Sequence, residues 1–111
     1  MTTVELFSRE PGELGLRVQG HSGSAPAGKD LVCAASSILA WTLAEAAGEE
    51  PRYHASVTVE QDGAMIEVSC FPEDKAKESC LVMIGTIWTG YKLLAEREPE
   101  YIQIRSDNDA E

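Results

Sequence analysis

The chain has 111 residues, 43% of them hydrophobic, which is enough for one domain, residues 1–111, with a single core and too few for two. Nineteen acidic against nine basic residues give a formal net charge of −10, which repels nucleic-acid phosphates, so we expect no direct nucleic-acid binding. Three cysteines without a Cys-x-x-Cys pair and only two histidines argue against a disulfide framework, a redox motif or a metal-ligand set, and we expect no metal site and no cofactor.

The N-terminal residues show no basic region followed by an apolar run, so the sequence predicts no signal peptide and a cytoplasmic protein. The two longest apolar stretches, 31–47 and 80–95, contain Ser, Thr, Glu, Gly or Lys. Such stretches are typical of core helices, and we expect no membrane span.

Alternating residues at 3–7 and at 14–18, with turn residues at 10–13 between them, predict an antiparallel hairpin. The even-numbered residues of the second run are apolar and face the core, so His21 falls on the opposite side unless the chain bends at Gly20. A bend at Gly20 would direct His21 towards the start of the next helix.

A loop of small residues follows at 22–28. A plain connection between strand and helix fits this composition. A mobile loop over a substrate fits it as well, since glycines absorb large backbone changes. In the second case the substrate loop includes Gly20, Ser22, Gly23 and Gly28.

The next element is a helix predicted over 30–48, with Asp30 as its N-cap and Pro51 preventing its continuation. Cys33 falls in the first turn, where the positive end of the helix dipole favours a thiolate. The apolar stripe predicted to be buried consists of Leu31, Ala35, Ile38, Leu39, Thr42, Leu43 and Ala46.

His21 and Cys33 together are typical of a nucleophile and its base, because an imidazole beside a thiol can take its proton. From spacing alone two simpler interpretations stay open: Cys33 as a small buried hydrophobe, and His21 as a hydrogen-bonded structural residue. Ser37 follows Cys33 by one helical turn. Its hydroxyl either approaches the sulfur or bonds back to the Cys33 carbonyl.

Two further alternating runs, 53–60 and 64–71, are separated by Gln61-Asp62-Gly63 and predict a second hairpin. Cys70 continues the inward-facing parity and is expected to be a core thiol. His54 stands at a strand entrance with no motif around it, and we expect a surface or capping role. The apolar pairs expected on the inner face join Val57 and Val59 to Ile66 and Val68.

A second helix is predicted over 72–98 and a short strand over 101–105, with a frayed acidic tail over 105–111. Gly85 and Gly90 would permit close packing against the first helix or a second subunit. The predicted buried stripe of this helix consists of Cys80, Ile84, Ile87, Tyr91 and Leu94.

The order of predicted elements is ββαββαβ. It indicates an α+β fold, a mainly antiparallel sheet with two helices packed on one face. An open face or edge of this sheet could support a homodimer.

Two segments carry a family resemblance: Gly20-His21-Ser22-Gly23, and the run from Gly28 to Ala35 with Ser37 after it. They resemble the signature of the ribosomal-processing cysteine protease family, and the order of elements agrees over nearly the whole chain. In that family the histidine of the Gly-His motif and the cysteine of the Asp-(Ile/Leu)-Val-Cys-Ala-Ala motif form the catalytic pair.

The resemblance implies that His21 and Cys33 are catalytic and that Asp30 and Ser37 support them. It also implies a homodimer and a substrate, the N-terminal extension of a bacterial large-subunit ribosomal protein, removed after a short segment rich in aromatic residues. Two positions depart from the family pattern, since serine replaces the commoner alanine at Ser22 and an aliphatic residue at Ser36.

The sequence thus predicts a cysteine endopeptidase in which Cys33 attacks the peptide bond and His21 acts as general base and then general acid. Asp30 would orient His21 or cap the helix, and backbone N–H groups at the helix start would form an oxyanion hole. A basic ribosomal protein would suit the charge of −10. The alternative is a non-catalytic ribosome-associated interaction module, in which acidity and dimer shape matter and the cysteine serves packing.

Overall fold

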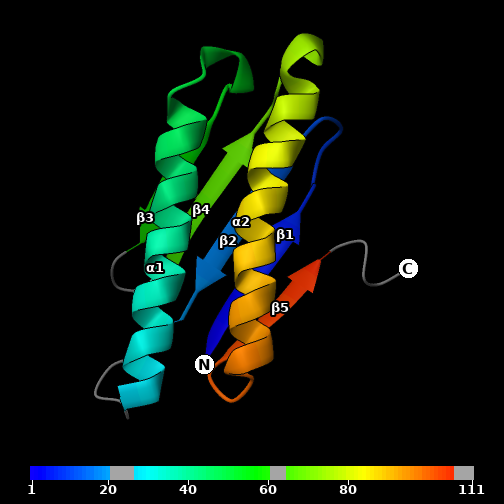
Figure 1. Ribbon diagram of the computed structural model, residues 1–111. Coiled ribbons are helices and arrows are strands. Elements are labelled where there is room, and N and C mark those ends of the chain that lie inside the picture. Colours follow the sequence, from blue (N-terminus) through cyan, green and yellow to red (C-terminus); the bar gives the residue numbers. More distant parts are fainter. Residues whose placement is uncertain (21–26, 61–64, 107–111) are drawn as a thin grey trace.

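Two helices lie side by side on one face of a five-stranded sheet in the computed structural model of this chain (Figure 1). The structure describes residues 1–20, 27–60 and 65–106, and of residues 27–30 the backbone alone. The strands are β1 (Thr2–Phe7), β2 (Leu14–Gln19), β3 (Ser56–Glu60), β4 (Met65–Cys70) and β5 (Ile102–Ser106), and the helices are α1 (Ala27–Gly48) and α2 (Lys77–Arg97). Short 3-10 turns at Pro51–Tyr53 and Asp74–Ala76 precede β3 and α2.

The strand order is β3-β4-β2-β1-β5. β1 with β2, β2 with β4 and β3 with β4 are antiparallel, and β5 is parallel to β1. A parallel neighbour needs a crossover connection, which α2 supplies. The predicted order ββαββαβ, the mainly antiparallel sheet and the two helices on one face are confirmed.

β5 extends one residue beyond the predicted strand, to Ser106. Arg105 pairs with Glu5 and Ser106 with Leu6 across the parallel ladder, so the predicted tail over 105–111 is wrong at these two residues. Residues 107–111 lie outside the described residues.

The core lies between the sheet and the two helices, and Tyr91 is its largest fully buried side chain. The Tyr91 hydroxyl donates to the backbone carbonyl of Ser36 at 2.7 Å, which ties α2 to α1. A Cβ at Gly90 would lie 2.8 Å from Leu39 Cδ2, so glycine permits the close approach of the helices, as predicted. At Gly85 nothing lies within 4 Å of such a Cβ, and this glycine faces open space.

The predicted buried stripe of α1 is wrong at several positions. Leu31 and Ile38 are 71% and 64% exposed, whereas Val32 and Ala40 are buried. Apolar residues occupy both faces of this helix, so their spacing alone does not single out the core face. The face against the sheet and α2 consists largely of small residues, which allow close packing.

Val57 and Val59 pair with Ile66 and Val68 as predicted, with Val57 opposite Val68 and Val59 opposite Ile66. The two valines are 43% and 44% exposed, however, and not part of an inner face. β3 is an edge strand, and helix–sheet contact reaches β4 but is slight at β3. The hairpin was therefore predicted correctly and the burial of its outer strand was not.

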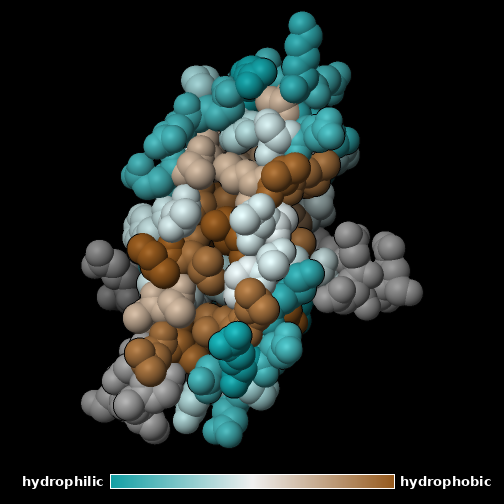
Figure 2. Space-filling model, in the orientation of Figure 1, coloured by the Kyte–Doolittle hydropathy of each residue, from teal (hydrophilic) through white to brown (hydrophobic). Residues whose placement is uncertain are grey.

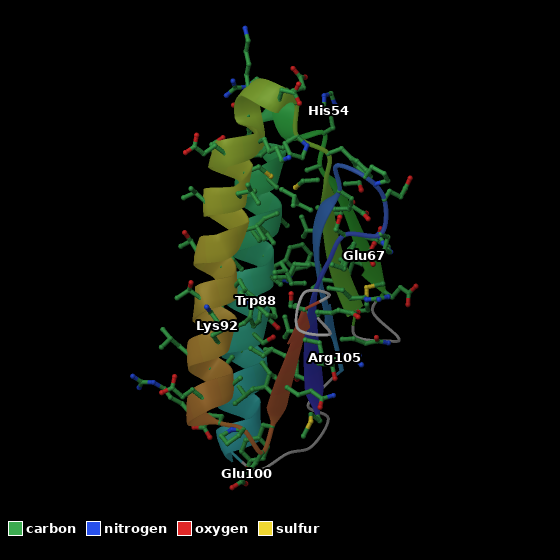
Figure 3. All side chains as sticks on the ribbon, turned by 90° about the vertical axis from the view of Figure 1, so that its right-hand side faces the viewer. His54, Glu67, Trp88, Lys92, Glu100 and Arg105 are labelled. Atoms are coloured by element: carbon green, nitrogen blue, oxygen red, sulfur yellow. The ribbon has the colours of Figure 1, made fainter. Side chains whose placement is uncertain are left out.

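The face of the sheet away from the helices carries charged side chains, with Glu67 and Arg105 labelled there in Figure 3. Its most buried member is Glu13, 2% exposed, which accepts hydrogen bonds from the backbone N–H of Arg9 at 2.8 Å, the Arg9 guanidinium at 3.0 Å and Ser69 Oγ at 2.7 Å. The hydrogen bonds from Arg9, above all, lower the pKa of Glu13 to about 2, against the opposing effect of burial.

Glu13→Gln should make the stability of the protein less sensitive to acid. The native pKa of Glu13 lies below its ordinary value of 4.5, so its contribution to stability is complete above that pH and is lost as the pH falls towards 2. At pH 7 we expect the variant to lose about 1–3 kcal/mol of unfolding free energy, because a buried charge-assisted network is broken. Denaturant unfolding at pH 7 and pH 3 measures both effects. Glu10→Gln, at an exposed neighbouring carboxyl, is the control, and equal pH profiles for the two variants would contradict the assignment.

Candidate active site

The three cysteines differ sharply in their access to solvent. Cys70 and Cys80 are both fully buried, and burial raises the pKa of Cys70 to about 12 and also raises that of Cys80. Cys33 is partly exposed. A nucleophilic cysteine must be accessible and must form a thiolate, so Cys33 is the candidate nucleophile and Cys70 is the core thiol that the sequence predicted.

Cys33 lies in the second turn of α1 and not in the first. The helix begins at Ala27, three residues before the predicted N-cap Asp30, so Asp30 and Gly28 are both within its first turn. Ala27 is a strong helix former and Pro26 precedes it in the sequence, and proline is favoured at a helix start. The segment between β2 and α1 therefore ends at residue 26, and the influence of the helix dipole on Cys33 is weaker than predicted.

The sulfur of Cys33 has a polar neighbour that sequence reasoning missed. Thr2 Oγ1 lies 3.9 Å from Cys33 Sγ, and this is the hydrogen-bond partner of the sulfur within the described part of the chain. The backbone N–H of Thr2 donates to the carbonyl of Tyr101 at 2.9 Å. The start of β1, the second turn of α1 and the residue before β5 therefore meet at one end of the sheet.

Gly20 brings the end of β2 to the same place. Its φ is +117°, and a Cβ there would lie 2.5 Å from the carbonyl oxygen of Met1 and 3.1 Å from Thr2 Cα. Both the backbone conformation and the lack of space require glycine. The bend predicted at Gly20 and the direction of His21 stay predictions, because His21, Ser22 and Gly23 lie outside the described residues.

His54 has the surface and capping role that the sequence predicted. It adopts the left-handed conformation after the Pro51–Tyr53 turn, with φ of 45°, and its backbone N–H donates to Pro51 O. Its side chain is exposed and Nε2 lies 2.9 Å from Glu73 Oε2. Figure 3 places His54 at the opposite end of the molecule from Glu100. Glu100 precedes Tyr101, whose carbonyl accepts from Thr2, the neighbour of Cys33. His54 is too far away to serve Cys33, so His21 is the remaining imidazole.

Ser37 is exposed on α1, one turn beyond Cys33. Among the hydrogen bonds of the described residues, none joins Ser37 to the Cys33 sulfur or to its carbonyl. Ser36 is 2% exposed, and its Oγ has no hydrogen-bond partner among the described residues. The family that the motif resembles usually has an aliphatic residue at this position. Such a residue would pack here without leaving a buried hydroxyl unpaired, as Ser36 does among the described residues.

Within the described part of the chain, no three His, Cys, Asp or Glu side chains gather closely enough to hold a metal ion. The polar group that contacts the Cys33 sulfur in this part of the chain is instead the Thr2 hydroxyl. A hydroxyl can stabilise a thiolate.

The sequence model of the family described as cysteine protease Prp matches residues 1–103. The chain belongs to the Prp family of cysteine proteases. Its motif residues at 20–23 and 28–35 fall within that match, and the protein is a cysteine protease.

Solved structures share this fold over nearly the whole chain. The crystal structure of SMU.848 from Streptococcus mutans is 27% identical, with a TM-score of 0.71, covering 96% of this chain and 93% of that one. Two crystal structures of the essential ribosomal processing protease Prp from S. aureus, one with a covalently linked product peptide and one with a substrate peptide, are 18% and 17% identical, each with a TM-score of 0.76 and covering 96% of this chain and 100% of theirs. No curated protein matches the chain.

Proposed function

We propose that this Prp-family protein is an endopeptidase that removes the N-terminal extension of a bacterial large-subunit ribosomal protein, with Cys33 as nucleophile and His21 as its base. The observation that carries the proposal is the contrast among the cysteines: Cys33 alone of the three is partly exposed, beside a polar group. The S. aureus Prp structures, which hold substrate and product peptides, support a peptide substrate.

In the proposed mechanism His21 accepts the proton of the Cys33 thiol, and the thiolate attacks the carbonyl carbon of the scissile bond. The carbonyl oxygen becomes an oxyanion, and backbone N–H groups in the first turn of α1 are the candidate donors to it, because a helix leaves its first four N–H groups unpaired. His21 then gives its proton to the leaving amine. Water, deprotonated by His21, hydrolyses the thioester and restores the thiol.

Asp30 and Ser37 have supporting roles in this proposal. Asp30 lies in the first turn of α1, where it would orient His21. Ser37 is exposed one turn beyond Cys33, where it would contact the bound peptide. Gly20, Ser22 and Gly23 belong to the segment proposed to receive the substrate, while Gly28 belongs to the helix that follows it.

The charge of the protein supports a basic substrate. A net charge of −10 attracts cationic polypeptides and opposes binding to nucleic acid directly. Ribosomal proteins are basic because they bind RNA. An enzyme that processes one of them before assembly would act in the cytoplasm, which is the location we propose.

The test of this function is direct cleavage. The protein is incubated with the host's large-subunit ribosomal proteins that carry N-terminal extensions, and the new N-terminus is identified by mass spectrometry. The proposal expects one cut after a short segment rich in aromatic residues. Failure to cut any of them, with Cys33 reduced and the protein folded, would contradict it and favour an interaction module.

We further propose that the protein is a homodimer that pairs through the outer face of α1 and α2. Large apolar side chains are exposed on this face, and Figure 2 shows hydrophobic residues gathered over both helices. Its exposed members are Leu31, Ile38, Trp41, Leu81, Val82 and Leu93. A patch of this kind on a folded protein marks an interaction surface.

A second copy of this chain is the occupant that fits the patch best. No charged residue occurs at 31–44 of α1 or 79–91 of α2, so two chains of net charge −10 can meet there without juxtaposing like charges. The stretch Leu31–Gly48 has a mean hydropathy of 1.5 and is long enough to cross a membrane, but 33% of it is buried inside this fold. Because part of this helix packs into the core, we favour a helix whose outer face contacts another protein over one that crosses a membrane.

Replacing Ile38 and Val82 together with glutamate should convert the dimer to monomers. Both side chains are 64% exposed, so their replacement costs the isolated fold little, whereas four carboxylates at a two-fold interface repel each other. Light scattering should fall from twice the chain mass of 12.0 kDa to one chain mass. Val57→Glu is the control and should stay dimeric, because Val57 is 43% exposed but lies on the edge strand β3, away from the proposed interface. A monomeric wild type, or one that binds lipid vesicles through this face, would refute the dimer.

A further inference from the structure

Thr2 places a hydroxyl where the fold would accept an apolar side chain. It is the first residue of β1, and its side chain is 3% exposed on the same inward face as Val4, which is fully buried. A buried hydroxyl destabilises a protein unless it finds a partner. The partner of this one is the sulfur of Cys33, 3.9 Å from Thr2 Oγ1.

The position of Thr2 is set by the backbone on both sides and not by Cys33. Its N–H donates to the carbonyl of Tyr101 at 2.9 Å, which joins it to the segment entering β5. On the other side Gly20 lies so close that a Cβ there would come within 3.1 Å of Thr2 Cα. The hydroxyl is therefore held beside the sulfur before any substrate arrives.

Ionisation of Cys33 fixes the direction of this contact. In the thiol state either atom could be the donor. Once the sulfur has lost its proton it can only accept, so the Thr2 hydroxyl must donate to it, and a hydrogen bond to a charged acceptor is stronger than one to a neutral thiol. The contact is consequently a stronger hydrogen bond when the sulfur is ionised.

We propose that Thr2 is a positioning residue whose hydroxyl donates a hydrogen bond to the Cys33 thiolate, raising its population at neutral pH and directing the sulfur. The inference rests on the proposed function, in which Cys33 is the nucleophile and its proton passes to His21. Since Cys33 lies in the second turn of α1, where the helix dipole has weakened, a side-chain donor supplies the stabilisation that the helix start does not.

The experiment compares alkylation of Cys33 by iodoacetamide across pH in the wild type, Thr2→Val and Thr2→Ser. Valine keeps the shape and removes the hydroxyl, and serine keeps the hydroxyl. Peptide mapping separates Cys33 from the buried Cys70 and Cys80, and intact mass verifies that all variants carry the same N-terminus. Thr3→Val is the matched control, because Thr3 faces the other side of β1 and its Oγ1 accepts from Gln103.

Thr2→Val should alkylate about tenfold more slowly than the wild type at neutral pH and equally fast at high pH, where the thiol is fully ionised in both. The pH midpoint of its alkylation moves upward. On a substrate peptide kcat at neutral pH falls by about the same factor with KM little changed. Thr2→Ser and Thr3→Val should follow the wild type. Should Thr2→Val melt early, Thr2→Ala removes the same hydroxyl and must show the same upward shift.

An unchanged midpoint in folded Thr2→Val and Thr2→Ala would overturn the inference, and so would a shift of equal size in Thr3→Val. These results are separable from those for the proposed function. If the wild type cleaves its substrate and the midpoint does not move, Thr2 serves packing alone and the protease proposal stands. If no ribosomal protein is cleaved but the midpoint moves, the contact of Thr2 with the Cys33 thiolate stands and the proposed substrate is wrong.

Discussion

Cys33→Ala should abolish peptide cleavage and leave the fold intact. Loss of a nucleophile removes several orders of magnitude in kcat, whereas alanine is a strong helix former and replaces a side chain that is only partly buried. The activity is measured on the ribosomal-protein substrate, and the melting temperature reports the fold. We expect no detectable cleavage and a melting temperature close to that of the wild type.

The other two cysteines provide matched controls with the opposite result. Cys70→Ala and Cys80→Ala remove fully buried side chains, so they should lower the melting temperature, since truncation in a packed core leaves a cavity. At temperatures where these variants are folded, cleavage should persist. Activity retained in Cys33→Ala and lost in folded Cys80→Ala would show that the nucleophile was assigned to the wrong thiol.

His21→Ala should also lower cleavage by several orders of magnitude, because the thiol then has no base and the leaving amine no acid. The double variant with Cys33→Ala should be hardly worse than either single variant, since residues that act as a unit give strongly non-additive losses. The comparison uses single-turnover rates on one peptide.

His54→Ala is the control for the effect of losing an imidazole. His54 bonds Glu73 on the surface at the far end of the molecule, so its removal should leave the cleavage rate unchanged. If the losses from His21→Ala and Cys33→Ala instead add on a logarithmic scale, His21 acts in a step that does not involve the thiol.

The strands could be predicted from the sequence because alternation and turn chemistry are local signals. The hairpins over β1–β2 and β3–β4, and the pairing of Val57 and Val59 with Ile66 and Val68, followed from these signals alone. The same signals did not predict that Val57 and Val59 of β3 are exposed. Their exposure depends on β3 being an edge strand with little helix contact, which is a property of the assembled fold.

The first helix shows a different limit. Leu31 and Ile38 fit an apolar stripe by spacing, yet they are exposed, since α1 has a second apolar face that points away from the core. Periodicity measures how apolar residues are distributed and does not say which neighbour they meet. An interaction surface and a core face give the same pattern.

Cys33 could be found from the sequence, but its partner Thr2 could not. The motif around the cysteine is contiguous, whereas Thr2 is 31 residues away and reaches the sulfur only in the folded chain, where the start of β1 lies beside α1. The one local signal was a threonine in phase with Val4 on the inward face of a strand. Such a residue is too common to indicate a site by itself.

The contact between Thr2 and Tyr101 has a consequence for when the protein acquires activity. Tyr101 precedes the last strand, so it leaves the ribosome after His21 and Cys33 have long emerged. Until β5 pairs with β1, the N–H of Thr2 lacks the carbonyl that holds it, and the hydroxyl beside the nucleophile is not fixed. A contact between such distant segments forms late because its loop must close first. A growing chain therefore carries both proposed catalytic residues before the contact between Thr2 and Cys33 is in place, and the proposed support of the thiolate begins only when β5 has paired with β1.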